Sequence, residues 1–548
     1  MPSMRFKSCR LSFLVRWFMR SVGAPASILA LASSIMAAPV LKLETTDANT
    51  GRPLPARFSL EVNGVPFQPD DIGPHGVRFL SLHDSKKQFR AITYTRGTFP
   101  VEIPLPAAAR TVTVHTAKGF EFFPVSKTIK VSDYSTPGDI RVNIPLRRWS
   151  SLTLEGWASS DPHLHYDRFS RSANIDWFVM MAGDDLESIH FMMLKGGKVP
   201  GEWGTQYAYG KRGEAREGAR LITAGEEYRD SAQGHINLLG IGKIIPPIMA
   251  GRNGVPNFPF LRDVFLETRK MDGIGGIAHG GALGTKTTAA LDVILGAADF
   301  MEIANTHLYV PGLWYRLMNA GFFIPPVGGT DLPNYPARDP WQPFLGEMRT
   351  YAKVHDQHDF DAWKGAVKKG RVFVTSGPMV SFKVNGTDIG GALEFPLEGG
   401  EVEIDAVLKS PIPLTKMEIL KNGLPLPGKI VKKNLGGVHH WRIKTRLKVS
   451  ESCWFALRGK GSPIRALDDP RLKKQPWAET NVIAHTAATR VLVGGRRILS
   501  REDRDWLVRH LQEQRAFYES EARYWNDRQR KQRLQHFDEA VMKLKELK

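Results

Sequence analysis

Runs of alternating apolar and polar residues recur between residues 40 and 148 and indicate strands. Such runs lie at residues 58–62, 101–103, 111–115 and 140–144, and Gly, Pro and Asp separate them. Alternation with a period of two is typical of a strand with one buried face, and short strands at this spacing are typical of an antiparallel sandwich. The pattern predicts a β-sandwich domain over residues 39–150, with a packing or attachment role.

Between residues 151 and 354, short apolar runs alternate with segments long enough for helices. The expected strands are 152–155, 221–224, 236–241, 274–278, 300–304 and 323–327. The expected helices are 173–186, 260–271 and 288–297. This alternation predicts an α/β domain with largely parallel strands.

The last third of the chain returns to strands and ends in helices. Residues 355–495 open with a helix around 362–367 and continue with strands at 371–375, 380–384, 402–407 and 454–457, which predicts a second β-sandwich. Residues 496–548 are rich in Glu, Arg, Gln and Lys, with Leu, Phe and Trp at helical spacing. They predict one or two amphipathic helices packed on the rest of the protein.

The first 38 residues have the features of an export signal. Five basic residues precede an apolar run over residues 22–36, and Ala37 and Ala38 follow it. The run is short and rich in Ala and Ser for a membrane span, although an uncleaved anchor is the alternative. We expect a cleaved signal peptide, a periplasmic or secreted protein that begins near Pro39, and no stable transmembrane span after cleavage.

Composition narrows the class of protein. Hydrophobic residues make up 42% of the chain and charged residues 24%, which excludes a mainly disordered or fibrous protein. The net charge is +19, and beyond the expected signal the basic cluster at residues 528–533 lies in a helical stretch that also carries many acids. A solvated helix face is therefore favoured over a nucleic-acid site. The two cysteines, Cys9 and Cys453, cannot form a cysteine zinc cluster, so any metal must be held by His, Asp and Glu.

Side chains suited to metal binding accompany the expected strands of the middle domain. His163 and His165 are two residues apart, so in an extended chain both imidazoles face the same side, and Asp161 could orient one of them. The other candidate ligands are Glu227, His235, His279 and Asp331. Most of them follow a strand, and ligands and metals bind at the carboxyl edge of parallel strands. Each residue alone could equally be a turn, capping or core residue.

The order His-x-His, Gly-x-Glu, Gly-His, Ala-His-Gly and Gly-Thr-Asp resembles the PHP (polymerase and histidinol phosphatase) metallohydrolases. More narrowly, it is similar to the CehA/McbA branch of carbaryl-hydrolase-like proteins. Three further segments support that branch: Met301-Glu-Ile-Ala-Asn305, Gly346-Glu-Met-Arg-Thr-Tyr351 and Gly370-Arg-Val-Phe-Val-Thr-Ser-Gly-Pro378. The resemblance covers residues 152–384.

The resemblance implies a distorted (β/α)7 barrel with divalent metal ions at the carboxyl edge of its strands. The implied ligands are His163, His165 and Asp331 for one ion and His235 and His279 for a second, with Glu227 bridging the ions or bound to one of them. The chemistry would be hydrolysis of an ester, amide, carbamate or phosphoester by metal-activated water. His and carboxylate ligands suit zinc, manganese or iron.

The chain also departs from the family pattern. The Thr-Asp-His expected after the second strand is replaced by Phe191-Met-Met-Leu-Lys-Gly-Gly197, and Asp331 is followed by Leu332 and Pro333 instead of beginning Asp-x-His. The nearest candidate for a further ligand after His165 is Asp167. The ligand set therefore suits one or two ions and is poor for three.

The sequence leaves three functions open. The first is an exported metal-dependent hydrolase of a small-molecule or polymer-derived substrate, with no role for nucleic acid. The second is a catalytically degenerate PHP-like protein that binds a carbohydrate or peptide at the cell envelope, and the third is a structural module. Arg349 and Tyr351 could contact an anionic substrate group or form a structural salt bridge. His307 could reach the site or be an ordinary loop residue, and Asp184 and Asp185 are expected to be solvated at a helix end.

Overall fold

The computed structural model describes residues 38–83, 88–134, 139–195, 202–252, 254–306, 308–333, 343–354, 359–462, 464–465, 479–480 and 482–547. From Ala38 onward these residues belong to one structural unit. Residues 1–37, which make up nearly all of the expected signal peptide, and His307 lie outside the described residues. No helix in the described ranges is long and apolar enough to cross a membrane.

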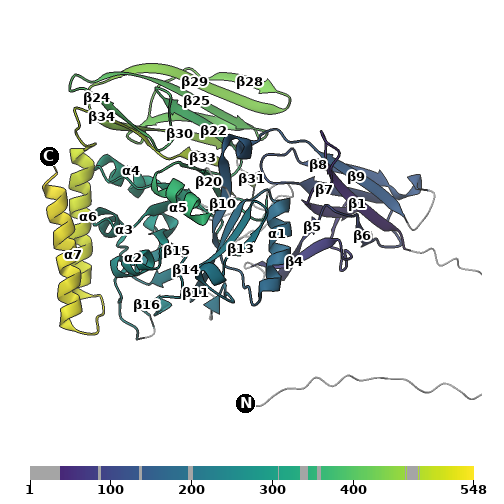
Figure 1. Ribbon diagram of the computed structural model, residues 1–548, viewed down its shortest axis with the longest axis horizontal. Coiled ribbons are helices and arrows are strands. Elements are labelled where there is room, and N and C mark those ends of the chain that lie inside the picture. The colour runs from purple at the N-terminus through teal and green to yellow at the C-terminus, as the bar shows by residue number, and fades with distance from the viewer. Residues whose placement is uncertain are drawn as a thin grey trace, which may run out of the picture. The chain divides into compact units, whose positions relative to one another are not determined.

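Two sheets follow one another in the N-terminal part of the chain (Figure 1, purple and dark blue). One sheet has the order β6 (Val101–Pro104), β1 (Val40–Asp47) and β9 (Ile140–Leu146). The other has the order β4 (Gly76–His83), β5 (Gln88–Thr95), β2 (Ala56–Val62), β7 (Thr111–Ala117) and β8 (Val125–Lys130), with β3 (Val65–Phe67) paired to β2. Side chains of both sheets form one apolar core, as alternation predicted, and every second residue of β9 is buried.

Seven strands of the middle region form one continuous sheet. Their order is β10 (Trp157–Leu164), β11 (Ser188–Lys195), β14 (Arg220–Asp230), β15 (Gly234–Leu239), β17 (Ile274–Ile277), β18 (Phe300–Ala304) and β19 (Pro326–Gly328). All neighbours are parallel except β15, which is antiparallel to both β14 and β17. A single bridge between Leu164 and Leu332 brings the first strand to the segment that follows the last.

In the part of the region that the structure describes, five helices accompany these strands: α1 (Asn174–Gly183), α2 (Leu261–Lys270), α3 (Ala289–Ile294), α4 (Gly312–Asn319) and α5 (Phe360–Lys368). The order departs from seven strand–helix units, because β14 and β15 form a hairpin. The described residues between β11 and β14 also hold only short elements: β12 (Glu202–Trp203), η4 (Gly210–Arg212) and β13 (Ala215–Glu217). The region is therefore mixed and strand-rich, and a (β/α)7 barrel is not confirmed.

The prediction of a strand at residues 152–155 is wrong. That segment is a 3-10 turn, η2 (Leu152–Glu155), which ends at Gly156 in a left-handed conformation with φ of 81°. The first strand, β10, begins at Trp157 and is buried along its whole length. Alternation could not reveal β10, because a strand buried on both faces has no polar face, and this one includes Ser159, Ser160 and Asp161.

The sheet continues into the C-terminal region. β20 (Arg349–Lys353) pairs with β10 and β21 (Val372–Thr375), and β21 pairs with β33 (Ile483–Thr486). From there the sheet includes β30 (Cys453–Gly461), β26 (Leu414–Lys421), β27 (Leu424–Pro425), β34 (Thr489–Val493) and β24 (Ala392–Phe395). A separate sheet has the order β23 (Thr387–Asp388), β22 (Met379–Val384), β25 (Gly400–Ser410), β29 (Val438–Val449) and β28 (Val431–Leu435). Side chains of this separate sheet and of the strands β26 and β30 share one apolar core, which agrees with the predicted second sandwich.

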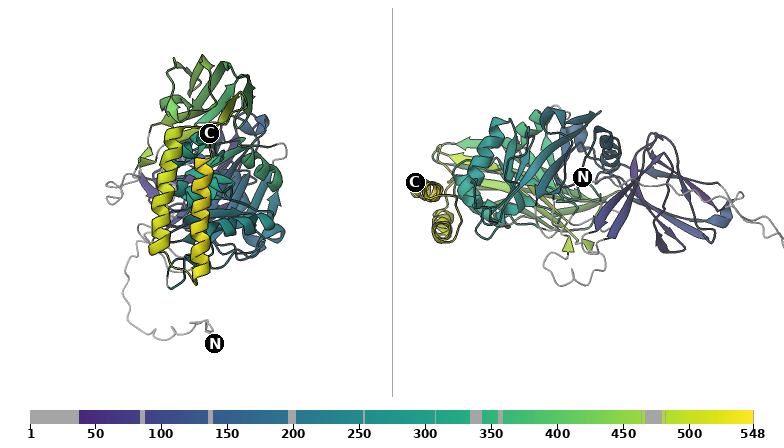
Figure 2. Two further views of the ribbon diagram at one scale, coloured as in Figure 1. Left: turned by 90° about the vertical axis from the view of Figure 1, so that its left-hand side faces the viewer. Right: turned by 90° about the horizontal axis from the view of Figure 1, so that it is seen from below.

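The chain ends in a hairpin of two helices, α6 (Arg501–Ser520) and α7 (Asp527–Lys545), which lie side by side (Figure 2, yellow). They pack against α3 and α4 of the middle region. Their apolar side chains join the core of that region, as the amphipathic pattern predicted.

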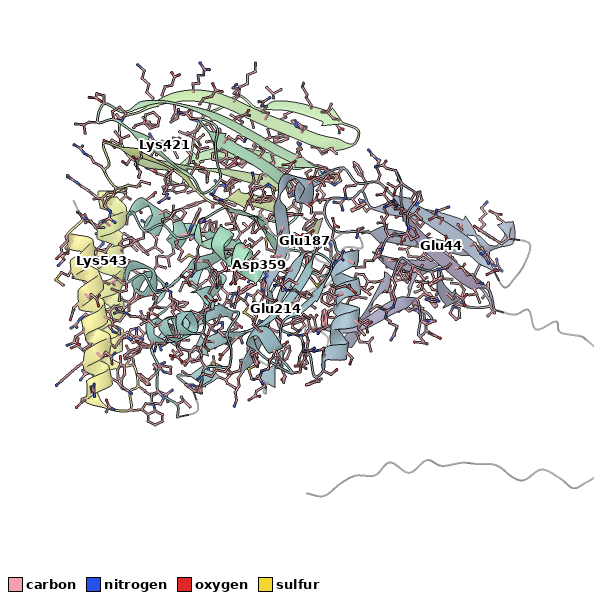
Figure 3. All side chains as sticks on the ribbon, viewed as in Figure 1. Glu44, Glu187, Glu214, Asp359, Lys421 and Lys543 are labelled. Atoms are coloured by element: carbon pink, nitrogen blue, oxygen red, sulfur yellow. The ribbon has the colours of Figure 1, made fainter. Side chains whose placement is uncertain are left out.

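The expectation that Asp184 and Asp185 are solvated is wrong. Asp184 is 1% exposed and accepts hydrogen bonds from the Tyr94 hydroxyl (2.6 Å) and the Leu345 N–H (2.9 Å). Asp185 lies 3.1 Å from the Arg148 guanidinium. Glu187, labelled in Figure 3, is two residues further on and accepts from the Ser159 N–H (2.7 Å). The N-terminal sandwich covers this end of α1, which could not be known from the helix alone.

Candidate metal centre

The six residues predicted as metal ligands gather at one place. His163 lies in β10 and His165 directly after it, His235 is the second residue of β15, and the remaining three are Glu227, His279 and Asp331. Because β15 runs antiparallel, its first residues lie beside the carboxyl ends of the parallel strands. The prediction that Glu227 follows its strand is wrong, since β14 continues to Asp230 to form the hairpin.

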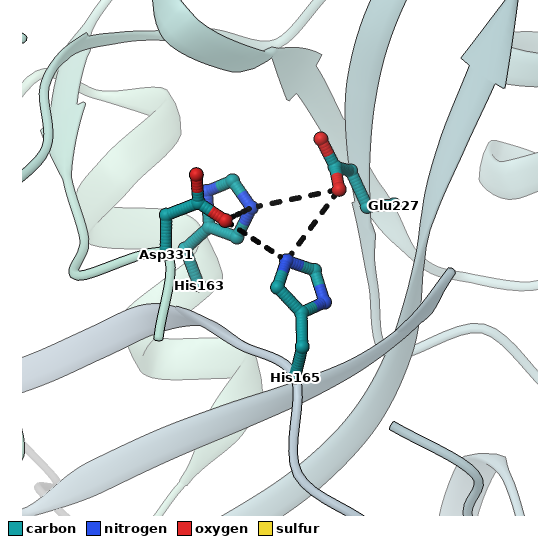
Figure 4. Close-up of side chains that lie close together, drawn as sticks. All are labelled: His163, His165, Glu227 and Asp331. Atoms are coloured by element: carbon teal, nitrogen blue, oxygen red, sulfur yellow. Dashed lines mark ion pairs between the residues drawn. The ribbon is translucent and has the colours of Figure 1, made fainter. Parts of the chain in front are cut away.

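Four of these side chains form a first ligand group, shown in Figure 4: His163, His165, Glu227 and Asp331. The Nε2 atom of His165 lies 3.2 Å from Asp331 Oδ1 and 3.4 Å from Glu227 Oε2. The Nε2 atom of His163 lies 3.5 Å from Asp331 Oδ1 and 4.0 Å from Glu227 Oε2. The ligand atoms of this group all lie within 4.8 Å of one another.

Glu227 also belongs to a second ligand group, with His235 and His279. Its other oxygen, Oε1, lies 3.0 Å from His235 Nδ1 and 3.1 Å from His279 Nε2. The carboxylate therefore presents Oε2 to one group and Oε1 to the other. A carboxylate in this position can bridge two cations.

The donor atoms of the first group fit a bound cation. The Nε2 atoms of His163 and His165 are buried and have no hydrogen-bond partner. Their Nδ1 atoms are occupied, one by Glu302 Oε1 (2.7 Å) and the other by the Met192 carbonyl (2.8 Å). A neutral imidazole with Nδ1–H donated turns a lone pair outward from Nε2, here toward carboxylate oxygens. Lone pairs that face one another need positive charge between them, which bound protons or a divalent ion can supply.

Glu302 is a residue that the set of predicted ligands missed. It is 1% exposed, and besides holding His163 it accepts a hydrogen bond from the backbone N–H of His279 (2.8 Å). His279 has a left-handed backbone with φ of 52°, an uncommon conformation that this bond helps to fix. Glu302 therefore orients one ligand of each group. It stands in the Met301–Asn305 segment, whose family resemblance was the available signal.

Asp161 does not contact an imidazole ring, contrary to the expectation. Its Oδ1 accepts from the N–H groups of His163 (3.3 Å) and Thr330 (3.0 Å), and its Oδ2 accepts from the Thr330 hydroxyl (2.7 Å) and the Gly346 N–H (2.9 Å). Burial raises the pKa of this carboxyl to about 6. Asp161 therefore ties β10 to the segment that carries Asp331.

Arg229 is a second residue that the sequence analysis missed. It lies two residues after Glu227 on the same face of β14 and donates from Nε (2.8 Å) and Nη2 to Glu227 Oε2. Burial works to raise the pKa of Glu227, but Arg229 and His235 hold it well below its ordinary value. Arg229 thus keeps the shared carboxylate ionised and in place.

The protons of the cluster are unevenly distributed. Burial opposes a charged imidazole at His163, yet Glu302 and Asp331 raise its pKa well above the ordinary value. Burial lowers the pKa of His235 to about 4. Ion binding at the first group must therefore release protons.

The residues suggested for substrate contact lie elsewhere or are not described. Arg349 is fully buried and donates to the carbonyls of Gly346 (2.7 Å), Asp185 and Asp184 (3.1 Å each). Tyr351 is also buried, and its hydroxyl donates to Glu121 (3.2 Å). These contacts give both side chains a structural role beneath the N-terminal sandwich. His307 lies outside the described residues.

Neither of two further positions adds a ligand to the described cluster. The end of β11, where the family has Thr-Asp-His, carries apolar Phe191, Met192 and Met193. Asp167 accepts a hydrogen bond from the Thr205 N–H (2.7 Å). The described residues thus form two groups of side chains that could each hold a metal ion.

Comparison with known proteins adds little to this geometry. No family model matches the chain, and no curated protein matches it. One similar solved structure is endonuclease Q in complex with a 27-mer duplex substrate that carries an abasic lesion, with 16% identity over 39% of this chain and a TM-score of 0.25. Another is the lesion-specific endonuclease of Pyrococcus furiosus, with 16% identity over 39% of this chain and a TM-score of 0.24. The chain spans 56% of the length of each endonuclease, so the case for function rests on the buried His, Glu and Asp cluster.

Proposed function

We propose that this protein is a metal-dependent hydrolase of the PHP type, acting on an ester, amide, carbamate or phosphoester. The observation that carries the proposal is the position of Glu227, which turns one carboxylate oxygen toward each of two buried ligand groups. Buried carboxylates are costly unless positive charge compensates them. Arg229 supplies part of that charge to Glu227, and the site also holds buried imidazole nitrogens without a hydrogen-bond partner: His163 Nε2, His165 Nε2 and His235 Nδ1.

The chain would hold one ion with His163, His165 and Asp331 and a second with His235 and His279, with Glu227 shared. Zinc, manganese and iron suit this set of nitrogen and oxygen ligands. A divalent ion supplies a Lewis acid that polarises the scissile group and activates water for attack.

The remaining residues prepare this site. Glu302 and the Met192 carbonyl fix the imidazoles, and Arg229 fixes the shared carboxylate. Outer contacts of this kind set ligand orientation and metal affinity. The side chains of His235 (17%) and Asp331 (11%) are the most exposed of the six ligands, so the substrate approaches from their side.

The finer assignments belong to the same proposal. Membership of the CehA/McbA branch rests on the motifs at residues 301–305, 346–351 and 370–378. Closure of a barrel is supported by the bridge between Leu164 and Leu332. Export rests on the pattern of residues 1–38, and N-terminal sequencing of the protein from its host should begin near Pro39. A cytoplasmic chain that retains Met1 would contradict export.

The apolar end of β11 favours a second candidate, a degenerate protein that binds a carbohydrate or peptide. Phe191 and Met193 stand where the family carries ligands, so part of the family's site is lost. This candidate predicts ligand binding without turnover.

Hydrolysis of a substrate panel separates the two candidates. We expect metal-saturated protein to hydrolyse activated aryl esters or phosphoesters, chelators to abolish the activity, and manganese or zinc to restore it. His163→Ala should keep its circular dichroism spectrum and lose activity. Failure on a broad panel of esters, amides, carbamates and phosphoesters would favour the binding protein. Activity that survives both chelation and His163→Ala would refute the metal mechanism.

A further inference from the structure

The turn that joins the two ligand-bearing strands β14 and β15 contacts the C-terminal helical hairpin. Arg533 of α7 donates from Nη2 to the side-chain oxygen of Gln233, the last residue of this turn (residues 231–233). Both residues are fully buried. The guanidinium also lies over the rings of Phe260 (3.9 Å) and Tyr518 (5.4 Å).

Burial of the Arg533 guanidinium carries a desolvation cost that lowers the stability of the fold. In the described part of the chain, Arg533 has no carboxylate within ion-pair distance, and its Nε and Nη1 atoms have no hydrogen-bond partner. Burying a guanidinium against a neutral amide costs solvation free energy. The positive charge of Arg533 works to lower the pKa values of the Asp263 and Asp292 carboxyls, which burial raises, so carboxylates beyond ion-pair distance offset part of this cost.

Gln233 connects Arg533 to the rest of the turn through hydrogen bonds. Its amide nitrogen donates to Asp230 Oδ2 (3.0 Å) and to the carbonyls of Asn257 (3.2 Å) and Pro259 (3.1 Å). Asp230 Oδ1 in turn accepts from the N–H groups of Ala232 and Gln233, at 2.8 Å each. The turn is therefore closed by side chains, with Arg533 at the outer end of the network.

The same turn holds the segment that follows His279. The carbonyls of residues 231, 232 and 233 accept from the N–H groups of Thr285 (3.2 Å), Lys286 (3.1 Å) and Thr288 (2.9 Å). The hydroxyl of Tyr518, from α6, donates to the Lys286 carbonyl (2.8 Å). The α6–α7 hairpin thus contacts both the turn between β14 and β15 and the segment after His279, which are the two parts of the chain next to the second ligand group.

The first ligand group is held from a different direction. Asp161 fixes the backbone near His163 and the segment that leads to Asp331. In the described residues, no hydrogen bond or ion pair joins α6 or α7 to His163 or His165. A change in the hairpin should therefore affect the two groups unequally.

We propose that the C-terminal helical hairpin is a positioning element of the metal centre: through Arg533 it fixes the β14–β15 turn and so places His235 and His279 for the second ion, relative to a Glu227 that Arg229 holds. This inference rests on the proposed metal-binding function. Arg533 is a positioning residue, because it acts through Gln233 and touches no ligand.

The test compares Arg533→Met with Arg515→Met in the full-length chain. Arg515 is a matched control, since it joins the same two helices through Asp538 (2.8 Å) on the exposed surface and does not contact the turn. Metal-free protein is titrated with zinc or manganese, and ions bound per chain and their affinities are measured. Backbone hydrogen exchange over residues 231–236 is measured on metal-free protein, which makes this readout independent of metal.

For Arg533→Met we expect about 10–100-fold weaker binding of the second ion, the size of effect typical of lost outer contacts, with the first ion retained. Exchange in the turn should rise about tenfold, and Arg515→Met should match the wild type in both respects. If Arg533→Met does not fold, Arg533→Lys decides by the same measurements, because it keeps a charge and a long stem but loses the planar donor group.

Two results would overturn the inference: two ions bound as tightly as in wild type, or unchanged exchange in the turn. Equally weakened binding of both ions would also contradict it, since the α6–α7 hairpin would then stabilise the fold as a whole and not the second ligand group in particular. If the wild-type protein binds no ion but hydrogen exchange in the turn rises in Arg533→Met, the proposed metal-dependent function is wrong, while the inference that Arg533 fixes the turn is confirmed.

Discussion

Glu227 is the residue on which the two ligand groups depend. Its carboxylate oxygens lie 3.0–3.4 Å from the nearest imidazole nitrogens of the two groups, and Arg229 holds it ionised. We expect Glu227→Gln to lose both ions, because an amide offers one weak ligand oxygen and no charge. His235→Ala should lose only the second ion. Metal content by mass spectrometry after dialysis measures both.

Glu226 supplies the control for this experiment. It is the neighbouring residue, is fully buried, and accepts from the Ile245 N–H (2.8 Å) outside the cluster. Burial raises its pKa to about 8, so it is protonated at neutral pH and Glu226→Gln changes little. If Glu226→Gln loses metal as fully as Glu227→Gln, the ligand assignment is wrong.

Single residues were predictable where their chemistry was local. The six candidate ligands stand out as His, Glu and Asp beside glycines and strand ends, and the structure brings all six together. Glu302 was missed as an orienting residue because its partner His163 is 139 positions away in the chain. For Arg349 and Tyr351 the sequence left substrate contact and a structural role open, because their partners Asp184, Asp185 and Glu121 lie in other parts of the sequence.

At the scale of elements, alternation succeeded where one face of a strand is exposed. It predicted strands in both sandwiches, such as β9 and β25, whose burial alternates. It failed at β10, which is buried throughout and begins after a 3-10 turn. It also ended the strand before Glu227, because Glu226, Glu227 and Arg229 are polar yet lie inside β14.

The link between β10 and the segment after β19 gives an element-scale prediction. Thr330 is buried, and its hydroxyl donates to Asp161 Oδ2 (2.7 Å). Thr330→Val leaves a buried carboxylate oxygen with one bond fewer, which should lower the free energy of unfolding by roughly 1–3 kcal/mol. The substitution should also weaken binding of the first ion and leave binding of the second unchanged. Urea unfolding measures the stability, and metal titration measures the two affinities.

Thr93→Val is the matched control, because Thr93 is a buried threonine of the N-terminal sandwich that donates to the Phe58 carbonyl (2.6 Å). It should lose stability and keep both ions. Normal affinity for the first ion in Thr330→Val would show that Asp161 does not position Asp331.

At the scale of the whole molecule, the described sheets join in ways that no local pattern reveals. The middle sheet continues into the C-terminal sandwich where β21 pairs with β33, more than a hundred residues later. The hairpin of β14 and β15 breaks the strand–helix alternation that the sequence suggested. Both features depend on contacts between distant segments, which are outside the reach of periodicity.

Buried histidines outside the cluster make the stability of the whole molecule depend on pH. His190 is fully buried, contacts the Thr223 hydroxyl (2.7 Å) and has a pKa lowered by burial to about 3. It is neutral in the folded protein and charged in the unfolded chain below its ordinary pKa. Its contribution is therefore complete above about pH 6.5 and is lost as the pH falls toward 3.

We expect this group to lower the free energy of unfolding by up to about 1.4 kcal/mol for each pH unit below 6.5. His190→Asn should flatten that slope. Urea unfolding of metal-free wild type and variant between pH 7 and 5 measures it, with chelator present so that ligand binding does not contribute. Parallel slopes for the two proteins would contradict the assignment of a neutral buried His190.

If the buried cluster binds divalent ions, metal-free protein should take them up in a fixed ratio to the chain. Metal-free full-length protein is equilibrated with zinc, manganese or iron(II), dialysed, and analysed for ions per chain. The geometry predicts two ions per chain for wild type, with Glu227 shared between them, and none for Glu227→Gln. Wild-type protein that binds none of the three metals would show that the cluster is not a metal centre, and Glu227→Gln that binds them as the wild type does would show that Glu227 is not a shared ligand.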